Sequence, residues 1–215
     1  MPLQKPRGRK RPSHKKAYFI LALVIIAILV GASYYTYSLL NPPRPTFVYA
    51  RIDTSMGSFE VELFNAWTPK TVANFVSLAE SGFYNNLTWH RIEPGFVIQT
   101  GDPNTRNGGG NRSLWGQGTS GTSIPFEYNS TLHNYEGYLG MASTAAKTGG
   151  TSQFYINLAN NTSLDGQYAV FGKVLNASGM KVVQAIGAVP VELVGSQHEP
   201  VTPVYVISVT ILKKP

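Results

Sequence analysis

The feature that most constrains this chain is an uninterrupted run of 24 uncharged residues at positions 17–40. About 20 apolar residues are enough to cross the hydrocarbon core of a bilayer as a helix. Tyr18 stands near one end of the run, and tyrosines 34, 35 and 37 stand near the other, as is typical of aromatic side chains at the two membrane interfaces. The run therefore predicts a single transmembrane anchor.

The charge of the chain lies mainly in front of this run. Seven of the 18 basic side chains fall in residues 1–16, which contain no acid, and the remaining 199 residues hold 11 of each sign. Basic residues next to a membrane span favour the cytoplasmic side, so the tail is expected in the cytoplasm and the body outside it, at the cell membrane. The balanced body shows no electrostatic footprint for nucleic acid, and we expect none as a partner.

A cleaved signal peptide is the alternative to a retained anchor. Val30-Gly31-Ala32 offers a small-residue cleavage site. The segment that follows, residues 41–46, is rich in proline and predicts a short stiff linker. Six Asn-x-Ser/Thr sequons lie beyond it, which fits an exported domain; they begin at Asn86, Asn111, Asn129, Asn160, Asn161 and Asn176.

The body, residues 47–215, has the pattern of a mainly β domain. Apolar runs at residues 48–53 and 59–63 flank a turn and predict a hairpin, and further runs predict strands at 95–99, 137–142, 153–158, 169–174 and 204–212. Thr68 and Pro69 predict the N-cap and first turn of a helix whose apolar stripe is Val72, Phe75, Val76 and Ala79. A second helix is predicted at residues 180–186. Many short strands and two helices indicate a barrel with helical caps.

Several chemical motifs are weaker than they look. Gly116-x-Gly118-x-x-Gly121 matches a dinucleotide fingerprint, but no strand precedes it and no helix follows, so it is interpreted as a mobile loop. Asp102 and Asp165 stand at glycine turns, where carboxylates usually accept from backbone amides. The four histidines lack metal-ligand spacing, and the chain has no cysteine for a disulfide or thiol chemistry.

Four sequence blocks carry a more specific signal together. They read WHRIEPGFVIQTGD at residues 89–102, LGMAS at 139–143, TSQFYI at 151–156 and LDGQYAVFGKV at 164–174. In this order and spacing they resemble the signature of the cyclophilins, and the helix TPKTVANFVSLAESGFY at 68–84 is similar to that family's helix. The resemblance implies a closed antiparallel β-barrel capped by two helices. It also implies a peptidyl-prolyl cis–trans isomerase acting on proline-containing polypeptides. Together with the predicted anchor, this makes an enzyme that assists the folding of exported proteins the leading hypothesis.

The chemistry of this reaction fits the residue types. Rotation about an X–Pro bond must break amide resonance, a barrier of about 18–20 kcal/mol, but no bond is made, so we expect no cofactor and no metal. A guanidinium can donate to the nitrogen of the twisted amide. By resemblance Arg91 is that donor and Gln99 its polar partner. The resemblance assigns substrate contacts to Phe96, Val97, Ala142, Ser143, Gln153, Tyr155, Leu164 and Tyr168.

The chain also departs from the family pattern. Phenylalanine is usual in place of Tyr155, histidine is common in place of Tyr168, and tryptophan is common in place of Ser163. An added hydroxyl at Tyr155 needs a hydrogen-bond partner, and strand alternation predicts that Phe154 faces the core. Two other functions stay open: a tethered proline-peptide binding module without catalysis, and a structural surface barrel. We expect the catalytic domain to be monomeric.

Overall fold

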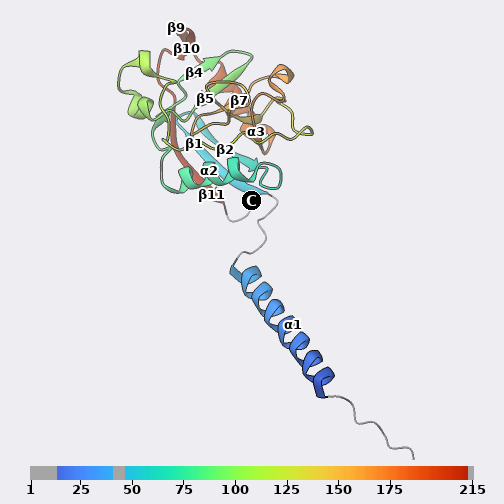
Figure 1. The fold of residues 1–215 in the computed structure, drawn as a ribbon. Coiled ribbons are helices and arrows are strands. Elements are labelled where there is room, and N and C mark those ends of the chain that lie inside the picture. The colour runs from blue at the N-terminus through green and yellow to red at the C-terminus, as the bar shows by residue number, and fades with distance from the viewer. Residues whose placement is uncertain (1–13, 41–46, 213–215) are drawn as a thin grey trace, which may run out of the picture. The chain divides into compact units, whose positions relative to one another are not determined.

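A computed structural model describes residues 14–40 and 47–212, and the chain divides into two units, Met1–Arg44 and Pro45–Pro215. The linker predicted at 41–46 and residues 1–13 of the predicted tail lie outside the described residues. In the first unit, α1 (His14–Leu40) is a 27-residue helix (Figure 1). Its segment Tyr18–Tyr37 is exposed throughout and is long and apolar enough to cross a membrane.

The second unit is built on one curled antiparallel sheet of nine strands, in the order β3-β11-β1-β2-β8-β6-β7-β5-β4. Its strands are β1 (Val48–Thr54), β2 (Gly57–Leu63), β3 (Leu87–Thr88), β4 (Arg91–Glu93), β5 (Val97–Thr100), β6 (Tyr138–Met141), β7 (Phe154–Asn157), β8 (Val170–Val174) and β11 (Tyr205–Leu212). A separate hairpin pairs β9 (Val191–Val194) with β10 (Gln197–Pro200). Short 3-10 turns are η1 (Pro103–Gly108), η2 (Arg112–Leu114) and η3 (Thr162–Leu164).

The prediction of a closed barrel is wrong, because the sheet stays open between β3 and β4. Within residues 47–212 no ladder joins these two edge strands. They are consecutive parts of one segment, separated only by Trp89 and His90. The covalent chain itself, rather than a row of hydrogen bonds, crosses the gap.

The first hairpin follows from period-two alternation. In β2 the side chains of Phe59, Val61 and Leu63 are buried, while Glu60 and Glu62 between them are half-buried. Gly57 takes a φ of +122° at the turn, a conformation that glycine adopts without steric cost. β1 pairs with β2 on one side and with β11 on the other, so it lies in the interior of the sheet.

Helix α2 (Pro69–Glu80) begins with proline, and Thr68 occupies the N-cap position, as predicted, but the Thr68 side chain makes no capping hydrogen bond. The Thr68 hydroxyl donates backward to Phe64 O at 3.3 Å. The first amides of the helix instead donate to a distant carboxylate: Lys70 N and Thr71 N bond the two oxygens of Glu127 at 3.1 and 2.7 Å. A negative side chain at this end also complements the helix dipole. Local sequence cannot reveal a cap that lies 56 residues away.

Helix α3 (Ala177–Gly187) begins three residues earlier than predicted. Asn176 is its N-cap and accepts from Gly179 N at 2.9 Å, the usual role of an Asn side chain at this position. The helix contacts β2, β4 and β5, while α2 contacts β11. Both helices therefore pack on the curled sheet rather than on each other.

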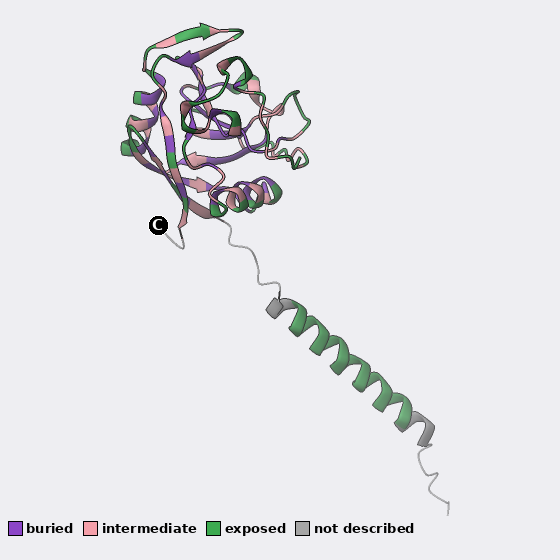
Figure 2. Ribbon diagram, turned by 90° about the vertical axis from the view of Figure 1, so that its left-hand side faces the viewer, coloured by how far each residue is buried: buried purple, intermediate pink, exposed green. Residues whose placement is uncertain are grey.

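The core lies inside the curl of the sheet, where the strands are largely buried (Figure 2). An aromatic cluster forms its centre: Phe75 of α2 packs against Tyr84, Phe154 and Phe171 in tilted and edge-to-face arrangements, with ring centroids 5.2–5.5 Å apart. Phe154 is fully buried, as strand alternation predicts. Because β5, β6 and β7 anchor their inner faces in this cluster and its neighbours, their outer faces are held in fixed positions.

Candidate active site

A row of side chains crosses the outer face of three neighbouring strands. In the ladder of β4 with β5, Arg91 pairs with Gln99, and in the ladder of β5 with β7, Gln99 pairs with Tyr155. Paired residues project from the same face of a sheet. The alternate residues of these strands, Ile92 and Ile98, are fully buried in the core. The fold thus sets an arginine, an amide and an aromatic ring side by side.

Gly140 extends the row onto β6 and gives the ring its room. It pairs with Tyr155 across the β6–β7 ladder, and a Cβ atom at Gly140 would collide with the Tyr155 ring. Any side chain here would push the ring out of its place. The LGMAS block therefore includes a glycine for a steric reason that lies on the neighbouring strand.

A cavity of about 320 Å³ opens over this row. Nine of the ten predicted site residues line it together: Arg91, Phe96, Val97, Gln99, Ala142, Ser143, Tyr155, Leu164 and Tyr168. Phe96 enters from the turn between β4 and β5, where Gly95 has a φ of +73°. Leu164 belongs to η3 and Tyr168 to the loop before β8. Segments spread over some 80 residues of sequence thus meet around one partly apolar hollow.

The tenth residue, Gln153, lies behind the row and holds Gln99. Gln99 Nε2 donates to Gln153 Oε1 at 2.9 Å, and Arg91 Nη1 donates to Gln99 Oε1 at 3.3 Å. Gln153 Nε2 in turn donates to Gly116 O and Gly118 O at 2.9 and 2.8 Å. Since an amide has one donor end and one acceptor end, each bond fixes the next. The orientation of Gln99 toward Arg91 is set by two backbone carbonyls.

The glycine-rich loop that supplies these carbonyls is anchored by Asp102. This fully buried carboxylate accepts from Gly116 N at 2.5 Å and from Gly118 N at 3.1 Å, and also from Asn104 N at 2.7 Å. The role predicted for Asp102, bonding backbone amides, is confirmed. The same loop follows η2 rather than a strand and lines a second cavity of about 500 Å³, which adjoins the first through Gln99, Ala142 and Ser143.

The hydroxyl of Tyr155 has a partner that the sequence did not reveal. It donates to Asn134 Oδ1 at 2.7 Å, and burial raises the pKa of Tyr155, so the hydroxyl keeps its proton. Asn134 is itself held by Asp165, whose Oδ1 accepts from Asn134 N and Nδ2 at 2.8 and 2.9 Å. His133 Nδ1 lies 2.7 Å from the other Asp165 oxygen. The backbone-bonding role predicted for Asp165 is confirmed, and it steadies the cavity floor.

His90 precedes Arg91 in the chain, and its side chain is fully buried. Neither ring nitrogen of His90 has a hydrogen-bond partner among the described residues. Burial lowers the pKa of His90 to about 4, so the imidazole is neutral at physiological pH.

Within residues 14–40 and 47–212 no group of three His, Cys, Asp or Glu side chains could hold a metal ion.

Comparison with known proteins identifies the fold and its chemistry. Residues 49–211 match the sequence model of the family described as cyclophilin type peptidyl-prolyl cis-trans isomerase/CLD. The chain is 44% identical over 163 residues to peptidyl-prolyl cis-trans isomerase-like 1 of Aspergillus niger, covering 75% of this chain and 93% of that protein. It is 39% identical over 175 residues to peptidyl-prolyl cis-trans isomerase A of Dickeya dadantii, covering 79% and 87%.

Solved structures agree with this. A cyclophilin type isomerase of Cryptosporidium parvum superposes with a TM-score of 0.68 at 29% identity, covering 79% of this chain and 99% of that one. A second structure of that protein, determined in the presence of the dipeptide Ala-Pro, has a TM-score of 0.66. The curled sheet, the row from Arg91 to Tyr155 and these matches lead to one conclusion: this chain belongs to the cyclophilin-type peptidyl-prolyl cis–trans isomerases.

Proposed function

We propose that this isomerase is held at the membrane by α1, faces the outside of the cytoplasm, and accelerates prolyl isomerisation while exported proteins fold. The observation that carries the catalytic part is the cavity shared by Arg91, Gln99 and Tyr155. An apolar wall holds the proline ring, and the guanidinium donates to the nitrogen of the twisted amide, whose lone pair is no longer delocalised. Gln99 keeps the guanidinium in place.

The energetic task of the site is modest. Uncatalysed X–Pro exchange takes tens to hundreds of seconds, and reaching milliseconds requires about 10⁴–10⁵-fold, or roughly 5.5–7 kcal/mol. One preorganised donor in a water-poor site supplies about 10²–10³-fold. Desolvation and orientation of the bound peptide in the cavity supply the remainder. The side chain of Arg91 is 30% exposed, which suits a group at the rim of such a cavity.

The membrane part of the proposal is supported by the apolar helix Tyr18–Tyr37 and by the basic residues in front of it. The absence of cysteine from the sequence permits a clean topology test. One variant carries Thr162→Cys in the body and another carries Ser13→Cys in the tail. In intact cells a membrane-impermeant maleimide should label only the Thr162→Cys chain, and both should be labelled after permeabilisation.

The opposite labelling pattern would place the body in the cytoplasm and refute the proposed location. A soluble labelled species that begins near Ser33 would instead identify a cleaved signal peptide. The enzyme and the binding-module alternative are separated by an isomerisation assay on a Xaa-Pro peptide with the full chain in detergent. Peptide binding without acceleration would favour the binding module.

A further inference from the structure

Glu93 lies directly beside Arg91 on strand β4. The two residues are two positions apart and project from the same face, while Ile92 between them is buried in the core. Arg91 Nε donates to Glu93 Oε1 at 3.2 Å, and Arg91 Nη1 donates to Gln99 Oε1 at 3.3 Å. The guanidinium is therefore held along its own strand by one residue and across the ladder by another.

Two bonds on different nitrogens fix a planar guanidinium. A single bond would leave the group free to rotate about it, whereas two bonds set both the plane and the rotation within the plane. Within residues 14–40 and 47–212, Nη2 of Arg91 donates no hydrogen bond to protein. Because Arg91 lines the cavity, Nη2 can donate a hydrogen bond to a peptide bound there.

Glu93 is itself held from a distant part of the chain. Its Oε2 lies 2.7 Å from His198 Nδ1, and its Oε1 accepts from His198 N at 3.3 Å. A carboxylate only accepts, so Nδ1 of His198 carries the proton. Burial acts to raise the pKa of Glu93, but the bonds from His198 and the charge of Arg91 outweigh it and hold this pKa below its ordinary value. Glu93 is thus charged at neutral pH.

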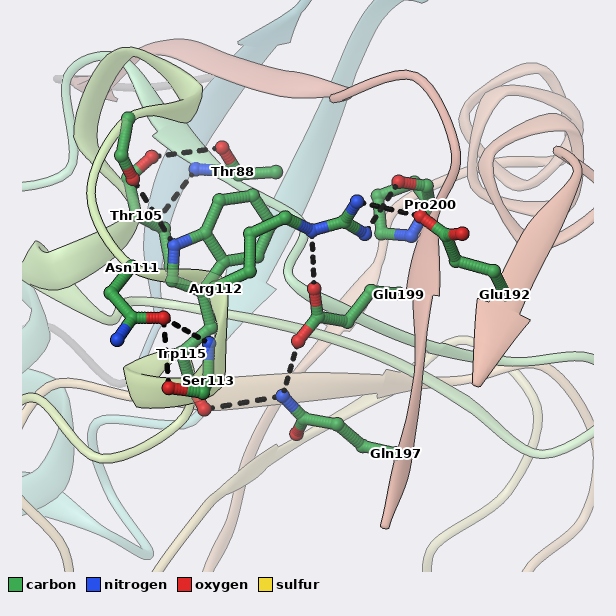
Figure 3. A network of polar contacts seen from close by, with 11 residues as sticks. Thr88, Thr105, Asn111, Arg112, Ser113, Trp115, Glu192, Gln197, Glu199 and Pro200 are labelled. Carbon is green, nitrogen blue, oxygen red and sulfur yellow. Dashed lines mark hydrogen bonds and ion pairs between the residues drawn. The ribbon is translucent and has the colours of Figure 1, made fainter. Parts of the chain in front are cut away.

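The strand that carries His198 is fixed from its other face (Figure 3). Arg112 Nη1 contacts Glu192 of β9 at 2.6 Å, and Arg112 Nε contacts Glu199 of β10 at 2.7 Å. Glu199 is fully buried. Since side chains alternate along a strand, Gln197 and Glu199 face the loop of Arg112, and His198 between them faces Glu93. The small β9–β10 hairpin therefore acts as a support for β4.

We propose that Glu93, held by His198, is a positioning residue for the isomerase reaction. It fixes the guanidinium of Arg91 so that its unbonded donor meets the amide nitrogen of the bound proline. The proposal rests on the proposed role of Arg91, and its test therefore includes Arg91→Ala as a reference. The remote hairpin β9–β10 becomes part of the catalytic apparatus without contacting substrate.

The test compares kcat/KM and peptide affinity for Glu93→Ala, Glu93→Gln, His198→Ala and Arg91→Ala in the full chain. Glu93→Ala should lower kcat/KM about ten-fold, because misplacing a catalytic group by a fraction of an ångström carries such a cost, while Kd for a Xaa-Pro peptide stays within about two-fold. Glu93→Gln keeps an acceptor oxygen and should recover to within about three-fold. His198→Ala should lose about two- to five-fold.

The matched control is Asp53→Asn. Asp53 bonds Arg51 Nε at 2.8 Å, also two residues apart on one strand, β1, and neither residue lines the candidate cavity. This variant should keep wild-type kcat/KM. A second readout is the Nε–Hε NMR signal of Arg91, identified by its loss in Arg91→Ala. It should move to the position of a freely rotating arginine in Glu93→Ala and stay unchanged in Asp53→Asn.

Three results would overturn the proposal while leaving the isomerase intact. First, Glu93→Ala could retain kcat/KM within two-fold while Arg91→Ala loses it. Second, the peptide affinity of Glu93→Ala could fall as far as its kcat/KM. Third, the Arg91 NMR signal could stay in place in Glu93→Ala. Wild-type activity in His198→Ala would remove His198 from the assignment. Full activity in Arg91→Ala would instead refute the arginine mechanism itself.

Discussion

Gln99 and Gln153 form a chain of two side-chain amides that links Arg91 to the glycine-rich loop. Replacing Gln153 by glutamate exchanges the amide nitrogen for an oxygen and leaves the shape of the side chain unchanged. In the wild type, Gln153 Nε2 donates to Gly116 O and Gly118 O at 2.9 and 2.8 Å. A carboxylate has no hydrogen to donate, so two carbonyl oxygens would then face an anion. Gln153 is only 9% exposed, and water cannot readily replace the lost donors. We expect Gln153→Glu to destabilise the fold at neutral pH.

The magnitude follows from the two bonds. Each neutral hydrogen bond contributes about 0.5–1.5 kcal/mol net, so the loss is about 2 kcal/mol, or roughly 4–8 °C in Tm for a domain of this size. Protonation restores one donor, so the folded state favours the protonated carboxyl and raises the pKa of the introduced group above its unfolded value of about 4.3. The folded state then binds more protons than the unfolded state, and stability falls as pH rises.

The assay is thermal unfolding of the full chain in detergent, followed by tryptophan fluorescence at a series of values between about pH 4 and about pH 8. The Tm of Gln153→Glu should approach that of the wild type at the acid end and fall below it as pH rises. Gln117→Glu is the control, because it adds the same charge at an exposed position of the same loop. A Tm difference between Gln153→Glu and the wild type that does not change with pH would refute the assigned orientation of the Gln99 and Gln153 amides.

Three further outcomes are expected. Arg91→Ala should lose about 10²–10³-fold in kcat/KM on a Xaa-Pro peptide with an unchanged circular dichroism spectrum, and Arg91→Lys should recover only part, since an ammonium lacks the planar fork; near wild-type rates would contradict the mechanism. Tyr155→Phe should cost about 1 kcal/mol in denaturant unfolding, because Asn134 Oδ1 loses its donor at 2.7 Å and, within residues 47–212, keeps only Asn157 Nδ2 at 3.4 Å, while activity stays within two-fold; equal stability would show that the hydroxyl is not bonded. Cyclosporin should inhibit weakly, and Ser163→Trp should tighten it by supplying an indole at exposed η3; stoichiometric inhibition of the wild type would contradict this.

Local patterns predicted the elements of this fold well. Alternation placed β2 and the inward-facing Phe154 correctly, and Pro69 marked the first turn of α2. These features depend on a few neighbouring residues and on the periods of strand and helix. What failed depends on contacts between distant segments: Glu127, and not the Thr68 side chain, bonds the first amides of α2, and whether a sheet closes is decided by the tilt and stagger of all its strands.

The candidate site shows the same division. Family blocks brought together the side chains that line the cavity, since those blocks record which residue types meet there. The supports behind them were not visible in sequence. Asn134 beneath Tyr155 and His198 beside Glu93 lie outside every block, and an amide or imidazole in a loop has many local uses. Only the folded chain shows that these residues face the site.

The pairing of β1 with β11 sets the timing of folding during synthesis. Ile52 pairs with Val209, so an interior strand of the sheet gains one of its two neighbours more than 150 residues after it is made. At about 5–20 residues per second this delay is roughly 8–30 s, during which the apolar inner faces of the early strands have no finished core to enter. In a chain anchored as proposed, α1 would already be inserted at that time. The half-made domain would wait beside the bilayer, in need of the kind of folding assistance that the finished enzyme gives to others.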